Sequence, residues 1–124
     1  CPHKKIIGVD RDGFFAEYIA MPATNVWHLD AETSYEVGGI HDPMGNAFHT
    51  ALHGTEIPGA TVLVTGCGPI GIFAVGICAA AGAARVIAVD VNPRRLELAR
   101  RMGAHDAVTP GEAEDAVRRA TQGY

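Results

Sequence analysis

Three short hydrophobic runs alternate with longer helical patterns in the second half of the chain. Residues 61–65 are rich in β-branched side chains and end in glycines, residues 86–89 are apolar and are closed by Asp90, and residues 107–109 form a shorter run. Runs of this length with few polar positions predict strands that are buried on both faces of a sheet.

Helix signals fill the gaps between these runs. A helix is expected over residues 69–81 and ends at Gly82, and a second is capped by Asn92, begins at Pro93 and ends at Gly103. A third is expected over residues 112–121. Strand and helix therefore alternate, which predicts an α/β fold with a parallel, doubly wound sheet of the Rossmann type, of which this chain holds part.

The first half of the chain has a different texture. Aromatic and β-forming residues predict a strand over residues 14–20. A helix is expected to start with Asp42 as its N-cap and Pro43 as its first residue, to run to about residue 53 and to end at Gly54. Residues 57–59 predict a linker, which gives two domains, 1–56 and 57–124.

Composition limits the classes of protein that fit this pattern. Hydrophobic residues make up 48% of the 124 positions, enough for one modest domain. Ten Lys and Arg against 14 Asp and Glu give a net charge of −4, which argues against a nucleic acid or a membrane surface as partner. The apolar run over residues 70–84 is too short to span a bilayer. Three cysteines without a regular framework favour the cytoplasm.

A glycine-rich turn carries the main chemical signal. Residues 66–71 read Gly-Cys-Gly-Pro-Ile-Gly and lie between a predicted strand and a predicted helix. Gly66 permits a tight turn, Gly68 lets the backbone approach a pyrophosphate, and Gly71 allows close packing of helix on strand. Pro69 loses nothing at the first helical position, where its N–H would have no partner. The helix N-terminus then favours an anion.

Asp90 completes the dinucleotide-binding pattern about 20 residues beyond the turn. A carboxylate at the end of the second strand accepts hydrogen bonds from the ribose hydroxyls of NAD and repels the 2′-phosphate of NADP. Arg95 is placed either to reach the adenosine ribose or to lie on a solvated helix face. The alternative for the whole motif is a glycine turn with an ordinary Asp at a strand end.

At this point the chain resembles the zinc-containing medium-chain dehydrogenases. The resemblance rests on residues 8–18, on the segment Asp-Pro-Met-Gly-Asn-Ala-Phe-His-Thr-Ala-Leu at 42–52, and on the glycine turn with residues 90–92 and 95–100. It implies that residues 1–56 are the end of a GroES-like, β-rich catalytic domain. The segment at 42–52 is the more specific part and favours the threonine-oxidising branch over the polyol dehydrogenases.

The resemblance implies a reaction and residue roles. The parent enzyme would oxidise the secondary alcohol of L-threonine to 2-amino-3-oxobutanoate with NAD and zinc, as a homotetramer. Ile70, Asp90 and Arg95 match NAD-contacting positions, Cys1 matches a structural-zinc cysteine, and Asp42 matches a proton-relay position beside the catalytic zinc. The ligands of that zinc precede Cys1 in the family, and the nicotinamide contacts follow Tyr124, so this piece is expected to be inactive alone.

Two other functions stay open at this stage. One is a polyol dehydrogenase of the same superfamily, and the other is a non-catalytic NAD-binding relative that has lost its zinc ligands. His49 and His53 are spaced as a possible metal-binding pair, although packed or surface histidines fit the sequence as well.

Overall fold

The computed structural model describes residues 2–54 and 56–123, which form two compact units, Cys1–Thr33 and Ser34–Tyr124. The division into domains 1–56 and 57–124, expected from the linker at residues 57–59, is a different division, and it stays a prediction.

The first unit holds little regular structure. It contains the 3-10 helix η1 (Ala23–Asn25) and a single bridge between Ile7 and Arg11. The strand predicted over residues 14–20 is wrong for this structure, where those residues form bends and extended coil. A strand needs a hydrogen-bonded neighbour. Here the N–H of Ala16 donates within the segment to the carbonyl of Phe14 at 2.8 Å, and the Arg11 guanidinium donates to the carbonyl of Ala20 at 3.1 Å.

Two consecutive helices open the second unit, α1 (Tyr35–Gly39) and α2 (His41–Leu52). Ser34 caps α1 through its hydroxyl, which accepts from the N–H of Val37 at 3.3 Å. The prediction that Asp42 is the N-cap of α2 is wrong, because Ile40 holds that position in a helical conformation and leads the chain from α1 directly into α2. Asp42 lies inside the first turn instead.

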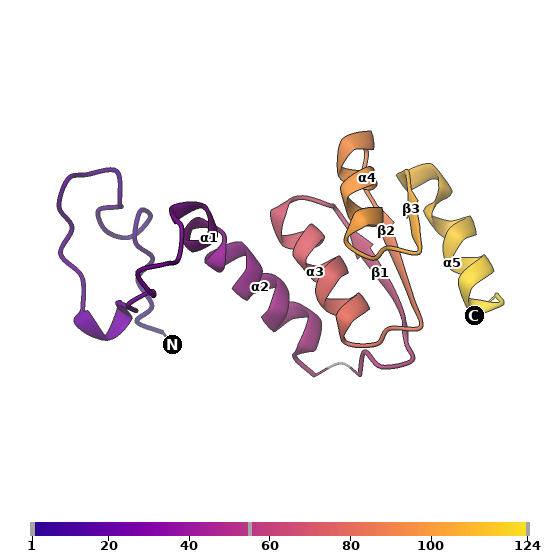
Figure 1. Ribbon diagram of the computed structural model, residues 1–124, viewed down its shortest axis with the longest axis horizontal. Coiled ribbons are helices and arrows are strands. Elements are labelled where there is room, and N and C mark those ends of the chain that lie inside the picture. The colour runs from indigo at the N-terminus through magenta and orange to yellow at the C-terminus, as the bar shows by residue number, and fades with distance from the viewer. Residues whose placement is uncertain (1, 55, 124) are drawn as a thin grey trace. The chain divides into compact units, whose positions relative to one another are not determined.

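Three parallel strands form the sheet in the order β1–β2–β3 (Figure 1). They are β1 (Thr61–Thr65), β2 (Arg85–Val89) and β3 (Asp106–Val108), with Thr61 opposite Arg85 and Ile87 opposite Asp106. All three predicted strands are confirmed, with bounds that differ by one residue in the second and third. The α/β class and the parallel sheet are therefore confirmed.

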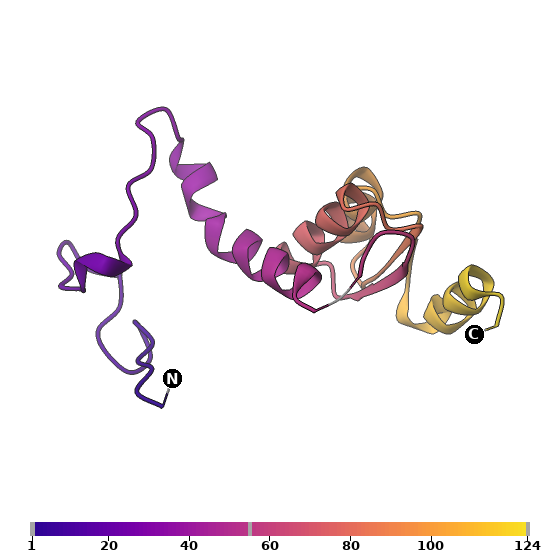
Figure 2. The same cartoon turned by 90° about the horizontal axis from the view of Figure 1, so that it is seen from below.

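Helices cover both faces of this sheet. The connecting helices α3 (Pro69–Ala80) and α4 (Pro93–Arg101) lie on one face and α5 (Ala113–Thr121) lies on the other, as Figures 1 and 2 show. This arrangement is the double winding that the sequence predicts. The helix predicted at 112–121 is confirmed as α5, which begins one residue later, and the short helix η2 (Pro110–Glu112) precedes it.

The core lies between the sheet and α3 and α4, and β2 runs through it. Val86, Ile87 and Ala88 have no exposed surface, and Val75 of α3 has none either. The predicted Asn92 cap is confirmed, since its side-chain oxygen accepts from the N–H of Arg94 at 2.9 Å. These contacts fix the carboxyl ends of β1 and β2, where the candidate site lies. Within the described ranges, no helix is both long and apolar enough to cross a membrane.

Candidate dinucleotide-binding site

The glycine turn joins the end of β1 to the start of α3. Gly66 has a φ of +87°, which an L side chain rarely adopts, and its N–H donates to the carbonyl of Val89 at 2.7 Å. Gly68 is the N-cap of α3 and Pro69 its first residue. The turn therefore aims the N-terminus of a 12-residue helix out of the sheet edge, with first-turn N–H groups that have no partner within the helix.

Gly71 and Gly68 differ in the space around them. A Cβ on Gly71 would collide with the carbonyl oxygen of Gly66, so the helix lies as close to the strand end as backbone allows. A Cβ on Gly68 would meet no atom within 4 Å. The space in front of Gly68 is open, which is where the sequence places a bound pyrophosphate.

Asp90 lies at the carboxyl end of β2, beside the turn. It is the one buried charged residue among those the structure describes, with 7% of its surface exposed. Its Oδ1 accepts from the N–H of Asn92 at 2.8 Å, and its Oδ2 accepts from the N–H of Cys67 at 2.7 Å. These two backbone donors, Asn92 first, lower the pKa of Asp90 below its ordinary value, against the opposing effect of burial.

Arg95 lies in the first turn of α4 with its guanidinium near Asp90. The distance from its Nη1 to Asp90 Oδ2 is 3.7 Å, and the Arg95 side chain keeps 52% of its surface exposed. Arg95 thus lies on an exposed helix face and beside Asp90 at once, and its contact with the adenosine ribose stays a prediction. Arg95 is close enough to share a ligand with Asp90 and exposed enough to move toward it.

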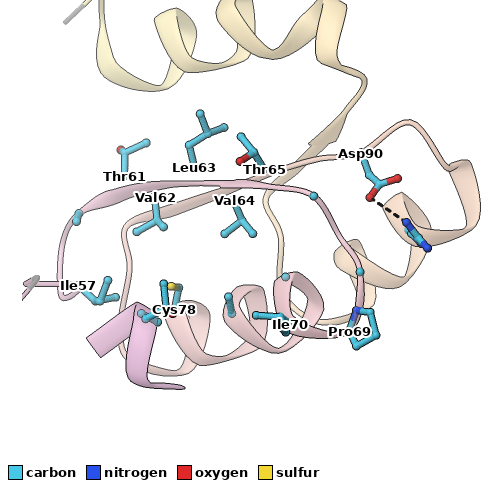
Figure 3. Close-up of a pocket in the computed structure, with 18 residues that line it drawn as sticks. Ile57, Thr61, Val62, Leu63, Val64, Thr65, Pro69, Ile70, Cys78 and Asp90 are labelled. Carbon is cyan, nitrogen blue, oxygen red and sulfur yellow. Dashed lines mark ion pairs between the residues drawn. The ribbon is translucent and has the colours of Figure 1, made fainter. Parts of the chain in front are cut away.

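One pocket collects these residues, as the close-up in Figure 3 shows. It has a volume of about 760 Å³ and runs along β1 from the end of α2 to the glycine turn. Val62 and Val64 point toward α3, whereas Thr61, Leu63 and Thr65 point to the other side of the strand. All the cofactor-binding residues expected from the sequence line it: Gly66, Gly68, Pro69, Ile70, Gly71, Asp90 and Arg95.

Both described cysteines of this region are buried thiols. Cys67 is 1% exposed and its Sγ lies 3.7 Å from the carbonyl of Val89, while Cys78 of α3 is 2% exposed. Burial raises the pKa of both thiols, and the charge of Asp90 adds to the rise for Cys67. Neither is therefore a reactive nucleophile. The hydrogen bond from the Cys67 N–H to Asp90 joins the glycine turn to the end of β2, a contact that residue spacing alone does not reveal.

The remaining predicted site residues lie elsewhere. Asp42 is exposed on α2, where its Oδ2 accepts from Asn46 Nδ2 at 3.3 Å, and it does not line the pocket. The rings of His49 and His53 stack with centroids 4.8 Å apart. Cys1 lies outside the described residues.

Zinc does not fit the residues present. Among residues 2–54 and 56–123 no group of three or more His, Cys, Asp or Glu is arranged to hold a metal ion. His49 and His53 have no third ligand beside them there. Among the described residues, therefore, the side chains form a candidate dinucleotide site and no group that could hold a metal ion.

The fold and the site define a class, the Rossmann-type NAD-binding portion of the medium-chain dehydrogenases. Residues 69–124 match the family model described as zinc-binding dehydrogenase. The structure superimposes on a short chain alcohol dehydrogenase from E. coli CFT073, solved in complex with NADH, with a TM-score of 0.85 at 30% identity. That match covers 100% of this chain and 37% of the other.

Within this class the similar curated proteins include L-threonine 3-dehydrogenases. The one from Symbiobacterium thermophilum is 46% identical over 126 residues, which cover 100% of this chain and 36% of that protein. The one from Bacillus subtilis is 47% identical over 118 residues, covering 95% and 33%. The chain thus spans about a third of the length of these relatives, and the predicted membership in the zinc-containing medium-chain dehydrogenases is confirmed.

Proposed function

We propose that this chain binds the adenosine diphosphate half of NAD. The observation that carries the proposal is the buried Asp90 at the end of β2, beside an open glycine turn at the start of α3. In this fold, ligands bind outside the carboxyl ends of the strands. The pyrophosphate is held by N–H groups of the turn and of the first helical turn, including those of Gly68, Ile70 and Gly71.

The ribose site follows from Asp90 and Arg95. Asp90 is ionised at neutral pH, because its pKa is lowered, and a carboxylate oxygen that already accepts one backbone N–H has a further lone pair for a ribose hydroxyl. The negative charge disfavours a 2′-phosphate, so the site selects NAD over NADP. Arg95, 3.7 Å away, shields part of that charge and contacts the same sugar.

The parent enzyme is proposed to oxidise the secondary alcohol of L-threonine to 2-amino-3-oxobutanoate. This rests on the similarity to L-threonine 3-dehydrogenases, of which the chain covers about a third. NAD, when bound, supplies the acceptor for the hydride that leaves the carbinol carbon. Asp42, exposed in the first turn of α2, is proposed to accept the alcohol proton as part of a relay. No step is assigned to zinc, because the described residues provide no metal site. A homotetramer in the cytoplasm is proposed by the same analogy.

A polyol dehydrogenase is the second candidate, favoured by a structural likeness. The galactitol-1-phosphate dehydrogenase from E. coli superimposes with a TM-score of 0.73 at 32% identity, covering 92% of this chain and 34% of that one. A non-catalytic NAD-binding relative is the third. Reduction of NAD by the parent protein with L-threonine, with sorbitol or with neither separates the three.

A titration of the 124-residue chain with NAD and with NADP tests the cofactor proposal. We expect NAD to bind more tightly, and we expect Asp90→Ala to lower NAD affinity at least tenfold, or about 1.4 kcal/mol, and to narrow the preference. Asp106→Ala is the matched control, because Asp106 is a carboxylate at the start of β3 that pairs with Arg85 at 2.8 Å, away from the pocket. Equal affinities for both cofactors, unchanged by Asp90→Ala, would remove Asp90 from the site.

A further inference from the structure

The carboxylate of Asp90 is bonded to the backbone on both sides before any ligand is present. One oxygen accepts from Asn92 at 2.8 Å in the β2–α4 turn, and the other accepts from Cys67 at 2.7 Å in the glycine turn. The second bond joins residues 23 positions apart and is buried. A residue whose only task is to meet a ribose at the surface has no need of this contact.

Apart from this bond, the described hydrogen bonds from the glycine turn to the sheet both end on the carbonyl of Val89, one from the Gly66 N–H and one from the Cys67 Sγ. Gly66 donates to the carbonyl of Val89 at 2.7 Å, and the N–H of Ile72 donates to the carbonyl of Gly68 at 2.9 Å within the start of α3. Between these two points the peptide of Cys67 is held by Asp90 on one side and by the buried Cys67 side chain on the other. The orientation of that peptide sets the direction of the N–H groups that follow it.

We propose that Asp90 is also a positioning residue for the pyrophosphate: by holding the Cys67 peptide, its carboxylate keeps the glycine turn in the shape that binds the diphosphate. This inference rests on the proposed function of the turn as a dinucleotide site. Ribose selection and phosphate-site order then depend on one side chain. A pre-ordered turn also avoids the entropic cost of ordering when the cofactor binds.

A consequence separates this role from simple charge repulsion. If Asp90 only repelled a 2′-phosphate, its removal would raise the affinity for NADP. If it also orders the turn, Asp90→Ala lowers NAD affinity, and for NADP the lost order of the turn opposes the relief of repulsion. The preference then narrows mainly through the loss of NAD binding.

Amide hydrogen exchange in the 124-residue chain without cofactor tests the positioning directly. The reporters are the N–H groups of Gly66 and Ile72, whose own hydrogen bonds do not involve Asp90. We expect Asp90→Ala to speed their exchange at least tenfold, while the N–H groups within β2 keep their rates. Asp90→Asn retains one acceptor oxygen and is expected to give an intermediate acceleration, and Asp106→Ala is expected to give none.

The outcomes are distinguishable. Unchanged exchange at Gly66 and Ile72 in both Asp90 variants would overturn the inference, and so would an equal acceleration throughout β2, which reports a loss of global stability. Should the unaltered chain bind no NAD, the proposed function fails, while the exchange result still decides whether Asp90 orders the turn.

Discussion

Two aspartates in this chain accept a backbone N–H at the same distance in different surroundings. Asp90 accepts from the N–H of Cys67 in the glycine turn at 2.7 Å, and Asp10 of the first unit accepts from the N–H of Ile6 at 2.7 Å. The first bond is buried and links two strand ends, whereas the second is exposed and closes a local turn between residues four positions apart.

The difference shows that bond length alone does not measure a contribution to structure. When a hydrogen bond between an exposed N–H and an exposed carboxylate breaks, both groups bond to water instead. The loss of free energy is therefore small. A buried N–H that loses its acceptor keeps the full penalty of being desolvated. We therefore expect the region around Asp90 to be sensitive to small changes and the turn at Asp10 to tolerate them.

The largest expected effect comes from Gly71→Ala, because the new methyl group would collide with the Gly66 carbonyl. Overpacking of backbone against backbone is expected to cost about 3 kcal/mol of unfolding free energy, measured by urea denaturation. Gly68→Ala is the control within the same turn: its Cβ meets open space, so stability changes by at most about 0.5 kcal/mol while NAD affinity falls. Equal losses of stability in Gly71→Ala and Gly68→Ala would contradict the steric role assigned to Gly71.

The pH dependence of Asp90 gives the next effect. Because its native pKa lies below the ordinary 3.8, the charged form contributes stability that is complete above that value and is lost as pH falls through the lowered pKa. The gap in unfolding free energy between the unaltered chain and Asp90→Asn should therefore shrink in acid. Asp10→Asn is expected to leave the urea midpoint unchanged at neutral pH. If the difference in unfolding free energy between the unaltered chain and Asp90→Asn stayed constant into strong acid, the stabilising role of the Asp90 charge would be contradicted.

Asn92→Ala removes the cap of α4 next to Asp90, and we expect a loss of about 1 kcal/mol. Ser34→Ala removes the matching cap of α1, a helix of 5 residues with no buried side chain. Unfolding of α1 exposes little of the core. We therefore expect Ser34→Ala to lower the global free energy of unfolding by less than half the loss expected for Asn92→Ala. Thermal or urea unfolding of both variants measures these two losses. Equal losses of unfolding free energy would show that burial of the helix does not determine how much its cap contributes.

The smallest effect is expected for Glu114→Gln on α5. Glu114 and Arg118 approach to 2.6 Å, but their side chains keep 77% and 68% of their surface exposed. An exposed pair of this kind contributes at most about 0.5 kcal/mol, and less in high salt. If Glu114→Gln lowered the free energy of unfolding by more than about 1 kcal/mol, also in high salt, the claim that exposed pairs contribute less than buried ones would be wrong.

The sequence predicts the second unit well because its signals are local and agree with one another. Residues 61–65 are rich in β-branched side chains and residues 86–89 are apolar. Pro69 and Pro93 begin helices, and each strand pairs with another strand of the chain. The glycine turn and Asp90 are recognisable because their spacing has a steric cause, which the collision at Gly71 makes visible.

The failures have equally specific causes. β-propensity at residues 14–20 was not enough for a strand, because no neighbouring segment of the structure pairs with it. Asp42-Pro43 is typical of a helix start, yet α1 leads straight into α2 and no cap is needed there. The bond from Cys67 to Asp90 joins positions 23 residues apart, and it depends on side-chain burial that no spacing rule contains.

The central claim is that the glycine turn and Asp90 hold a dinucleotide, and mapping of NAD onto the backbone amides by NMR tests it most directly. The account predicts that saturating NAD shifts the amide signals of Cys67, Gly68, Ile70, Gly71 and Asp90 more than any others. Largest shifts around the separate groove between Phe48, Phe73 and Met102, with those of the turn unmoved, would contradict it.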